Sequence, residues 1–201
     1  MPTMPPHRKK LRRFETIRQL HELTFSSYRR ESLLTTEPRL KALSSSLQQA
    51  CEAEGFDLAA FVFMPDHVHL LVWPRDADSR IARLLARTKQ PASKAIKDML
   101  LREQSPLIDR LTVQERPGKT CFRFWQEGAG FDRNLFSPKA IEASIDYLHA
   151  NPVRRGLCIH PTDWKWSSAR WYVDRVVDPD LPPLKVNAEW FDTSDVAHSP
   201  T

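Results

Sequence analysis

The chain is poor in cysteine and has no long apolar run. Its 201 residues contain 3 cysteines, Cys51, Cys121 and Cys158, which lie far apart and include no C-x-x-C spacing typical of zinc ligands. We therefore expect no disulfide framework, and we interpret the thiols as packing residues in a reducing compartment. No stretch approaches the length of a membrane span, and the opening Met-Pro-Thr-Met-Pro-Pro lacks the apolar core of a signal peptide. These absences predict a soluble, cytoplasmic protein without a membrane partner.

The charge of the chain is unevenly distributed. The net charge is +5, but residues 174–201 carry six acidic and two basic side chains, a balance of −4, which leaves +9 on residues 1–173. A basic body suggests a polyanionic partner such as nucleic acid, although many basic proteins bind none specifically. We therefore divide the chain into a basic flexible arm over residues 1–16, a domain over residues 17–173, and an acidic, proline-containing tail over residues 174–201 that we do not expect to form regular structure.

Hydrophobic periodicity predicts alternating strands and helices. Apolar residues that alternate indicate strands, and apolar residues at three- and four-residue spacings indicate helices. The order begins with a strand near residues 19–28, a helix over residues 37–54, and two strands, the second from His67 to Trp73, joined by a turn at Pro65 and Asp66. A helix over residues 79–101 follows, which we expect Pro91 to break or kink.

The remaining elements are a fourth strand and a third helix. Residues 102–120 are polar and contain prolines, so we expect an irregular excursion with a short helix. Alternating apolar and polar residues predict the fourth strand over residues 120–135, with an interruption at the glycines. Ser137 and Pro138 form a favourable helix start, and Pro152 is expected to end that helix at Asn151.

His67 and His69 form the first candidate site. Side chains alternate along a strand, so these two imidazoles should point to one face while Val68, Leu70 and Val72 point into the core. Two neutral imidazoles can bind a divalent metal such as Mn²⁺ or Zn²⁺, and with oxygen ligands also Mg²⁺. An H-x-H pair can also arise by chance, so the pair alone is weak evidence.

The helix over residues 79–101 carries a row of cations. Its outward-facing basic residues include Arg80, Arg83, Arg87, Lys94 and Lys97. We predict that these side chains contact phosphate beside the histidine strand, although a solvated basic face is a serious alternative.

Tyr147 and Asn151 form the second candidate site. They lie four residues apart on the third helix, so their side chains stack on one face. A tyrosine hydroxyl ordinarily ionises near pH 10 and is a weak nucleophile, but a metal that withdraws charge from a phosphodiester makes attack easier. His67, His69 and the Asn151 side-chain oxygen could supply three ligands. Tyr147 could equally be a half-buried aromatic, and Asn151 could simply cap the helix.

Four ordered segments together resemble a known family. They are Phe63-Met64-Pro65-Asp66-His67-Val68-His69-Leu70-Leu71-Val72, Phe124-Trp125-Gln126-Glu127-Gly128, Ile145 to Leu157, and Asp163-Trp164-Lys165-Trp166-Ser167-Ser168-Ala169. The chain from about residue 14 to residue 172 resembles the IS200-like single-tyrosine transposases, whose histidine pair is named HUH, and most closely their REP-associated branch. Each segment is weak evidence alone, but the four in order are highly specific.

The resemblance implies a fold, an activity and a set of site residues. The fold is an α+β, ferredoxin-like antiparallel sheet (βαββαβ) with helices packed on one face and the catalytic tyrosine on a helix after the fourth strand. The activity is cleavage and rejoining of single-stranded or hairpin DNA in DNA transposition, through a 5′-phosphotyrosine intermediate, by a monomer or homodimer. Tyr147 matches the nucleophile, and His67, His69 and Asn151 match the ligands of Mg²⁺ or Mn²⁺. Arg154 and Arg155, which follow in the same motif, join the residues expected to contact DNA.

The sequence departs from the family pattern at three places. Asn151 is shorter than the glutamine of the insertion-sequence members but matches the REP-associated pattern. The first strand has no glycine, and Phe131 stands where close relatives often carry tyrosine.

Two other functions fit the same residues. One is a DNA-hairpin-binding regulatory module without turnover, and the other is a metal-dependent nuclease that uses activated water. We also predict that the acidic tail partly occupies the DNA path and competes with phosphate, although a solvated extension is at least as good an interpretation.

Overall fold

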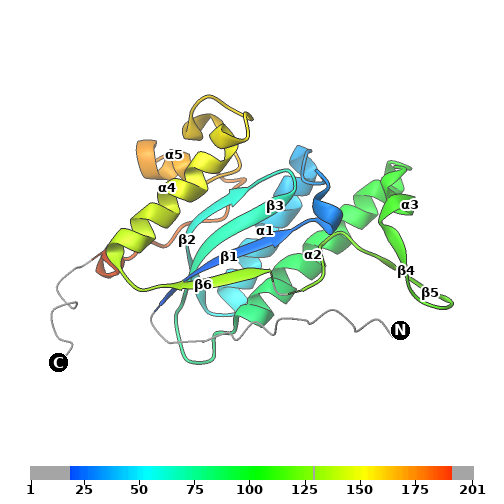
Figure 1. The fold of residues 1–201 in the computed structure, drawn as a ribbon, viewed down its shortest axis with the longest axis horizontal. Helices are drawn as coiled ribbons and strands as arrows, with labels where there is room; N and C mark the ends of the chain where they lie inside the picture. The colour runs from blue at the N-terminus through cyan, green and yellow to red at the C-terminus, as the bar shows by residue number, and fades with distance from the viewer. Residues whose placement is uncertain (1–18, 129, 192–201) are drawn as a thin grey trace, which may run out of the picture.

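The sheet has the strand order that the βαββαβ pattern predicts. The computed structural model describes residues 19–128 and 130–191, so the predicted arm over residues 1–16 and the end of the predicted tail lie outside the described residues. A four-stranded antiparallel sheet has the order β2-β3-β1-β6 (Figure 1). Its strands are β1 (Leu20–Ser26), β2 (Phe56–Phe63), β3 (His67–Pro74) and β6 (Phe131–Leu135). The ferredoxin-like fold is confirmed.

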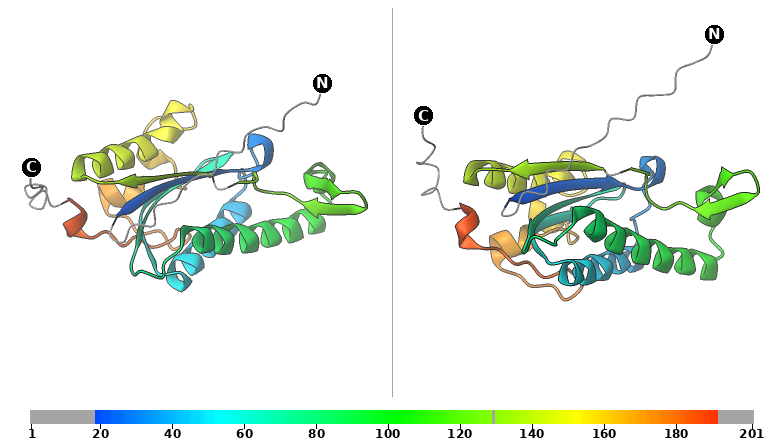
Figure 2. Two further views of the ribbon diagram at one scale, coloured as in Figure 1. Left: turned by 60° about the horizontal axis from the view of Figure 1, so that its bottom comes forward. Right: turned by 90° about the horizontal axis from the view of Figure 1, so that it is seen from below.

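The helices cover both faces of this sheet. Helices α1 (Glu37–Ala53) and α2 (Ile81–Arg102) lie side by side on one face, and α4 (Pro138–Arg154) lies on the other (Figure 2). The two helices inside the βαββαβ unit therefore share one face as predicted. The helix that carries Tyr147 occupies the opposite face, because it follows the last strand instead of connecting two strands.

Alternation along β3 divides its side chains between two cores. Val68, Leu70 and Val72 are fully buried with the apolar residues of α1 and α2. Leu71 belongs to the second core, which it shares with Ile145 of α4. Since side chains two residues apart share a face, the two histidines of β3 lie on the α4 side with Leu71.

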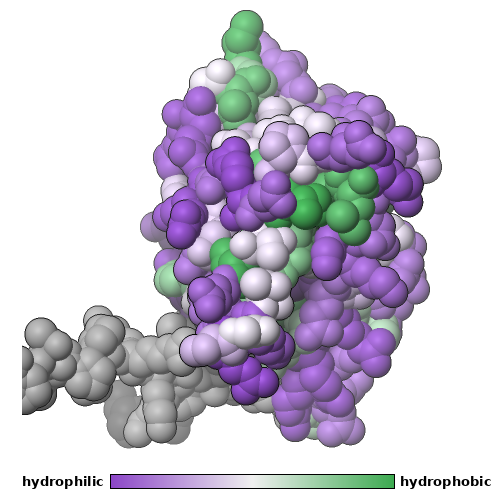
Figure 3. All heavy atoms as spheres, turned by 90° about the vertical axis from the view of Figure 1, so that its right-hand side faces the viewer, coloured by the Kyte–Doolittle hydropathy of each residue, from purple (hydrophilic) through white to green (hydrophobic). Residues whose placement is uncertain are grey.

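The prediction of one strand over residues 120–135 was wrong. After α3 (Leu107–Leu111), the chain forms a separate hairpin of β4 (Thr112–Arg116) and β5 (Lys119–Phe122) that projects from the body (Figure 1). Its turn contains Gly118 at φ +76°, a conformation that glycine adopts without strain. Residues 131–135 join the main sheet as β6, and Trp125 forms an isolated bridge to Ser27 at the end of β1. The predicted interruption at the glycines is therefore present, whereas residues 119–122 pair with β4 instead of the main sheet. The molecular face on this side is predominantly hydrophilic, with small apolar patches (Figure 3).

Helix α2 continues through Pro91 without the predicted break. A proline inside a helix removes one hydrogen bond and costs about 3 kcal/mol. The buried stripe of α2 extends on both sides of the proline, with Leu84 and Thr88 before it and Ala92 and Ile96 after it. Each large apolar side chain contributes about 1.5–3 kcal/mol when buried, so packing of the stripe outweighs the local cost.

The described part of the acidic tail is packed against the domain. Residues 174–191 contain little regular structure apart from the 3-10 helix η3 (Ala188–Phe191). The Lys185 amide donates a hydrogen bond to the Leu58 carbonyl of β2 (2.9 Å), and Trp190, only 5% exposed, stacks on Trp73 of β3. This segment is therefore part of the fold. In the described residues, no helix is long and apolar enough to cross a membrane.

Candidate active site

The two histidines of β3 form a buried pair on the α4 side of the sheet. His67 is 5% exposed and His69 is 8% exposed. Their ring centroids are 4.7 Å apart and the rings are nearly perpendicular, at 83°. The strand alternation thus places both imidazoles on one face, as the sequence predicts.

A hydrogen bond orients each ring through its Nδ1 atom. Nδ1 of His67 lies 2.8 Å from Oδ1 of Asp66, and Nδ1 of His69 lies 2.8 Å from Oγ1 of Thr24 on β1. An ionised carboxylate can only accept, so His67 carries its proton on Nδ1 and keeps a lone pair on Nε2. Thr24 can accept the same bond from His69. The arrangement matches metal sites in which a partner on one ring nitrogen orients the other toward the metal.

Both imidazoles are neutral at neutral pH. Burial, followed by repulsion from His67 and Arg30, lowers the pKa of His69 to about 4. Burial also lowers the pKa of His67 below its ordinary value, although the hydrogen bond with Asp66 opposes the shift. Neutral imidazole is the form that binds metal ions.

Asp66 connects the histidine pair to the end of α4. Its two carboxylate oxygens each accept a hydrogen bond of 2.8 Å from Nη2 of Arg155. Burial alone would raise the pKa of Asp66, but the bonds from His67 and Arg155 outweigh it and lower the pKa below the ordinary value. Asp66 and Thr24 were not among the site residues predicted from the sequence. Position in the turn directly before His67 was the only signal for Asp66.

Tyr147 of α4 lies beside the histidine pair. Its ring meets that of His69 edge-on, with centroids 6.1 Å apart, and it is 45% exposed. The guanidinium of Arg154 is 5.0 Å from the centroid of the Tyr147 ring. Tyr147 and His69 both line a groove of ≈ 530 Å³ between β1, β6 and α4, which we call the Tyr147 groove. No residue of the described part of the acidic tail lines this groove. The competition of the tail with phosphate along the DNA path stays a prediction.

Asn151 sits at the same end of α4, and Pro152 follows it inside the helix. The helix continues to Arg154, so the prediction that Pro152 ends it was wrong. Pro152 has no amide proton for the Leu148 carbonyl, and Nδ2 of Asn151 lies 3.4 Å from that oxygen and 2.9 Å from the Tyr147 carbonyl. With Nδ2 engaged, Oδ1 is the side-chain atom left to bind a ligand.

The donor set fits a divalent cation with open positions. Two neutral imidazoles and one amide oxygen suit Mn²⁺, and with further oxygen ligands Mg²⁺. Within residues 19–128 and 130–191, no three His, Cys, Asp or Glu side chains form a metal-holding group. The Asn151 amide, one helical turn after Tyr147, is the further protein oxygen predicted for a cation at His67 and His69, and the other ligands would come from outside the protein.

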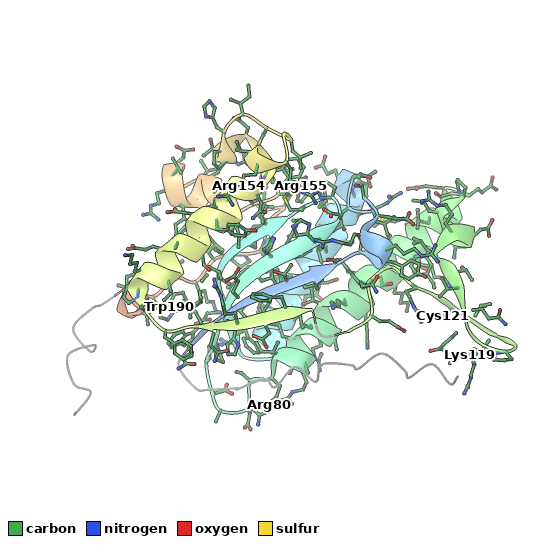
Figure 4. The ribbon with its side chains drawn as sticks, in the orientation of Figure 1. Arg80, Lys119, Cys121, Arg154, Arg155 and Trp190 are labelled. Carbon is green, nitrogen blue, oxygen red and sulfur yellow. The ribbon has the colours of Figure 1, made fainter. Side chains whose placement is uncertain are left out.

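The predicted DNA-contacting cations fall into two places. Arg154 and Arg155 lie at the end of α4, beside the histidine pair, whereas Arg80 lies at the far side of the molecule (Figure 4). Helix α2 packs on the face of β3 opposite the histidines, so the sheet separates its cations from the histidine pair. Their contact with phosphate stays a prediction.

The α2 cations themselves differ in their surroundings. Arg83 and Arg87 form ion pairs with Glu54, which is only 9% exposed, and Nη1 of Arg80 donates to the Ala77 carbonyl. Lys94 and Lys97 instead line a second groove, of ≈ 600 Å³, between α2 and residues 122–128.

Comparisons with known proteins agree with the motifs. Residues 18–110 match the family model described as Transposase IS200 like; this part includes the histidine pair and ends before Tyr147. A protein of Haemophilus influenzae (strain ATCC 51907 / DSM 11121 / KW20 / Rd), which is named for the REP-associated tyrosine transposases, is 26% identical over 149 residues, covering 72% of this chain and 79% of that protein.

A solved structure shares the fold. The structure of a REP-associated tyrosine transposase bound to a REP hairpin has a TM-score of 0.62 and 19% identity, covering 85% of this chain and 88% of that chain. The comparisons confirm the predicted resemblance to the IS200-like transposases and, among them, to the REP-associated tyrosine transposases.

Proposed function

We propose that this chain cleaves and rejoins single-stranded DNA beside a hairpin, with Tyr147 as the nucleophile. The observation that carries the proposal is the meeting of Tyr147 and His69 in one groove, with the Nδ1 atoms of both histidines already engaged. The hairpin in the similar solved structure supports hairpin DNA as the substrate class.

The reaction is a transfer of one phosphodiester bond to the tyrosine. The Tyr147 hydroxyl oxygen attacks phosphorus, the P–O3′ bond breaks, and the proton lost by the tyrosine is balanced by the proton gained by the 3′ oxygen. The products are a 5′-phosphotyrosine and a free 3′-OH, which rejoins DNA by the reverse step. Mg²⁺ or Mn²⁺ held by His67, His69 and Asn151 would withdraw charge from the scissile phosphate.

The other side chains of the site position these groups. Asp66 and Thr24 fix the two imidazoles. Arg154, next to the Tyr147 ring, can neutralise the phosphate as the tyrosine attacks. Arg155 is bound by Asp66 through Nη2, so it holds the end of α4 next to the histidine pair, and its contact with DNA stays a prediction.

A covalent adduct tests the proposal. The protein is incubated in Mn²⁺ with 5′- and 3′-labelled hairpin oligonucleotides that carry single-stranded flanks. The products are then separated by denaturing gel electrophoresis, which distinguishes a covalent protein–DNA adduct from free DNA. We expect a protein–DNA adduct on the strand that carries the 5′-phosphate, lost in Tyr147→Phe and retained in Tyr28→Phe, a tyrosine that lines no part of the groove.

Other outcomes select the alternatives. Tight binding of the hairpin by the unmodified protein with no cleavage product in Mn²⁺ would favour the regulatory module. Cleavage that persists in Tyr147→Phe without an adduct would favour a nuclease that uses water.

A further inference from the structure

One wall of the Tyr147 groove has no role in the proposed chemistry. The groove volume of ≈ 530 Å³ is in the usual range for sites that hold a small ligand or one ligand unit. Tyr147 and His69 form the reactive wall. The other lining residues come from β1, β6 and the first half of α4, and they include Glu22, Phe131, Arg133 and Ser144, which we call the β6 wall.

Arg133 is an exposed cation held by a buried carboxylate. Glu22 is 8% exposed, and its Oε2 accepts hydrogen bonds from Nε and Nη2 of Arg133. The Ser144 hydroxyl donates to the same Oε2 (2.9 Å) and accepts from Nη2 of Arg133 (3.2 Å). The Arg133 side chain is nevertheless 55% exposed. These bonds use Nε and Nη2, so Nη1 is the nitrogen they leave for a ligand in the groove.

Phe131 presents an aromatic ring next to this cation. It is 49% exposed, and it lies opposite Thr24 in the pairing of β1 with β6. Directly opposite side chains in a sheet share a face, so the ring lies on the same side as the Thr24 hydroxyl that binds His69. Gly130, at φ +72°, makes this close pairing possible, because a Cβ there would lie 2.2 Å from the Thr24 carbonyl oxygen.

We propose that the β6 wall binds one unpaired nucleotide of the strand that Tyr147 attacks, an inference that rests on the proposed function. The base stacks on Phe131, and Nη1 of Arg133 contacts a phosphate oxygen. A guanidinium with two nitrogens already bound to Glu22 cannot read a base edge with two parallel hydrogen bonds, so the contact is to the backbone. The site therefore holds a nucleotide next to the scissile phosphate without selecting its base.

A coupling experiment tests the stacking contact. A set of hairpin oligonucleotides is prepared, each with one abasic residue at a different position around the cleavage point. The affinity of the protein for each oligonucleotide is measured in the Tyr147→Phe background, so that no DNA is cleaved. We expect Phe131→Ala to weaken binding of intact DNA by roughly 5- to 150-fold, and to have no further effect on DNA that is abasic at one position. Phe136→Ala is the matched control, because Phe136 is 75% exposed and lies outside the groove.

The results separate this inference from the proposed function. Equal effects of Phe131→Ala on intact DNA and on every abasic DNA would overturn the stacking site, even where the Tyr147 adduct forms. Failure of the unmodified protein to bind any hairpin DNA would overturn both proposals. Substitution of the base at the coupled position should change affinity little, and a strong base preference there would contradict the backbone contact assigned to Arg133.

The Arg133 contact has its own readout. Arg133→Ala alone would leave Glu22 buried without its partner, so the test uses the double variant Glu22→Gln with Arg133→Gln, whose amides can bond each other. The slope of log affinity against log salt concentration should become shallower by about 0.7 if one phosphate contact is lost. An unchanged slope in a folded double variant would overturn the contact.

Discussion

Asp66→Asn should weaken metal binding much more than it weakens the fold. The carboxylate of Asp66 fixes the His67 ring and also receives both hydrogen bonds from Arg155. Asparagine has nearly the same shape but no charge, and one of its two terminal atoms is a donor. The variant therefore loses at least one bond from Arg155 and loses the carboxylate that keeps the proton on Nδ1 of His67.

The size of the effect follows from burial and from the role of the bond. The Asp66 side chain is 11% exposed but that of Arg155 is 50% exposed, so their pair lies between a buried pair and a surface pair. A loss of about 1–2 kcal/mol in the free energy of unfolding is expected. Loss of a partner that orients a metal-binding histidine typically lowers metal affinity by about 10- to 100-fold.

A second aspartate provides the matched control. Asp178 accepts a hydrogen bond of 2.9 Å from Arg170 and is 17% exposed, and neither residue lines the Tyr147 groove. Urea unfolding without metal should show similar destabilisation for Asp66→Asn and Asp178→Asn, whereas Mn²⁺ titration by calorimetry should show weaker binding only for Asp66→Asn. Equal Mn²⁺ affinities in the two variants would refute the role assigned to Asp66.

Two further predictions concern the cations of α2 and a buried histidine. Lys97→Ala should weaken hairpin binding several-fold at low salt and lower the salt dependence of binding, because Lys97 lines a groove. Arg83→Ala should change neither quantity, because Arg83 is paired with Glu54. Equal effects of the two substitutions in filter-binding or anisotropy titrations would contradict this distinction. Burial lowers the pKa of His149 from 6.5 to about 4, so the unfolded state binds the extra proton and the free energy of unfolding should fall as pH decreases from about 6.5 toward 4, by up to ~1.4 kcal/mol per pH unit. Urea unfolding of His149→Gln across this range should show a shallower slope, and an unchanged slope would exclude His149 as its source.

The sequence carried enough information to predict the sheet and the central pair of the site. Strand alternation alone placed His67 and His69 on one face and Val68, Leu70 and Val72 on the other, and the structure has this arrangement. The prediction that Tyr147 and Asn151 share one face of a helix needed only their spacing of four residues, because the period of an α-helix fixes that relation. The approach of Tyr147 to the histidines was predicted from the family resemblance and not from any local pattern.

The errors arose where distant contacts decide the structure. Local propensity indicated a break at Pro91, but a buried stripe along the whole helix overrides it. Residues 120–122 alternate as a strand should, yet they pair with residues 112–114 and not with the main sheet. The side of the sheet on which the α2 cations lie, and the pairing of Arg83 with Glu54, depend on tertiary packing that no sequence window contains.

The position of β1 at the centre of the sheet has a consequence for synthesis of the chain. It contacts β3 through Thr24 and His69, 45 residues apart, and β6 through His21 and Asp132, 111 residues apart. Pairings at such separations close slowly, and the sheet cannot be complete until β6 has left the ribosome. Tyr147 follows β6 in the sequence, on α4. A nascent or truncated chain that ends before α4 therefore contains His67 and His69 but lacks Tyr147, the proposed nucleophile. DNA-cleaving chemistry of the proposed kind is thus confined to chains whose sheet has already been fully synthesised.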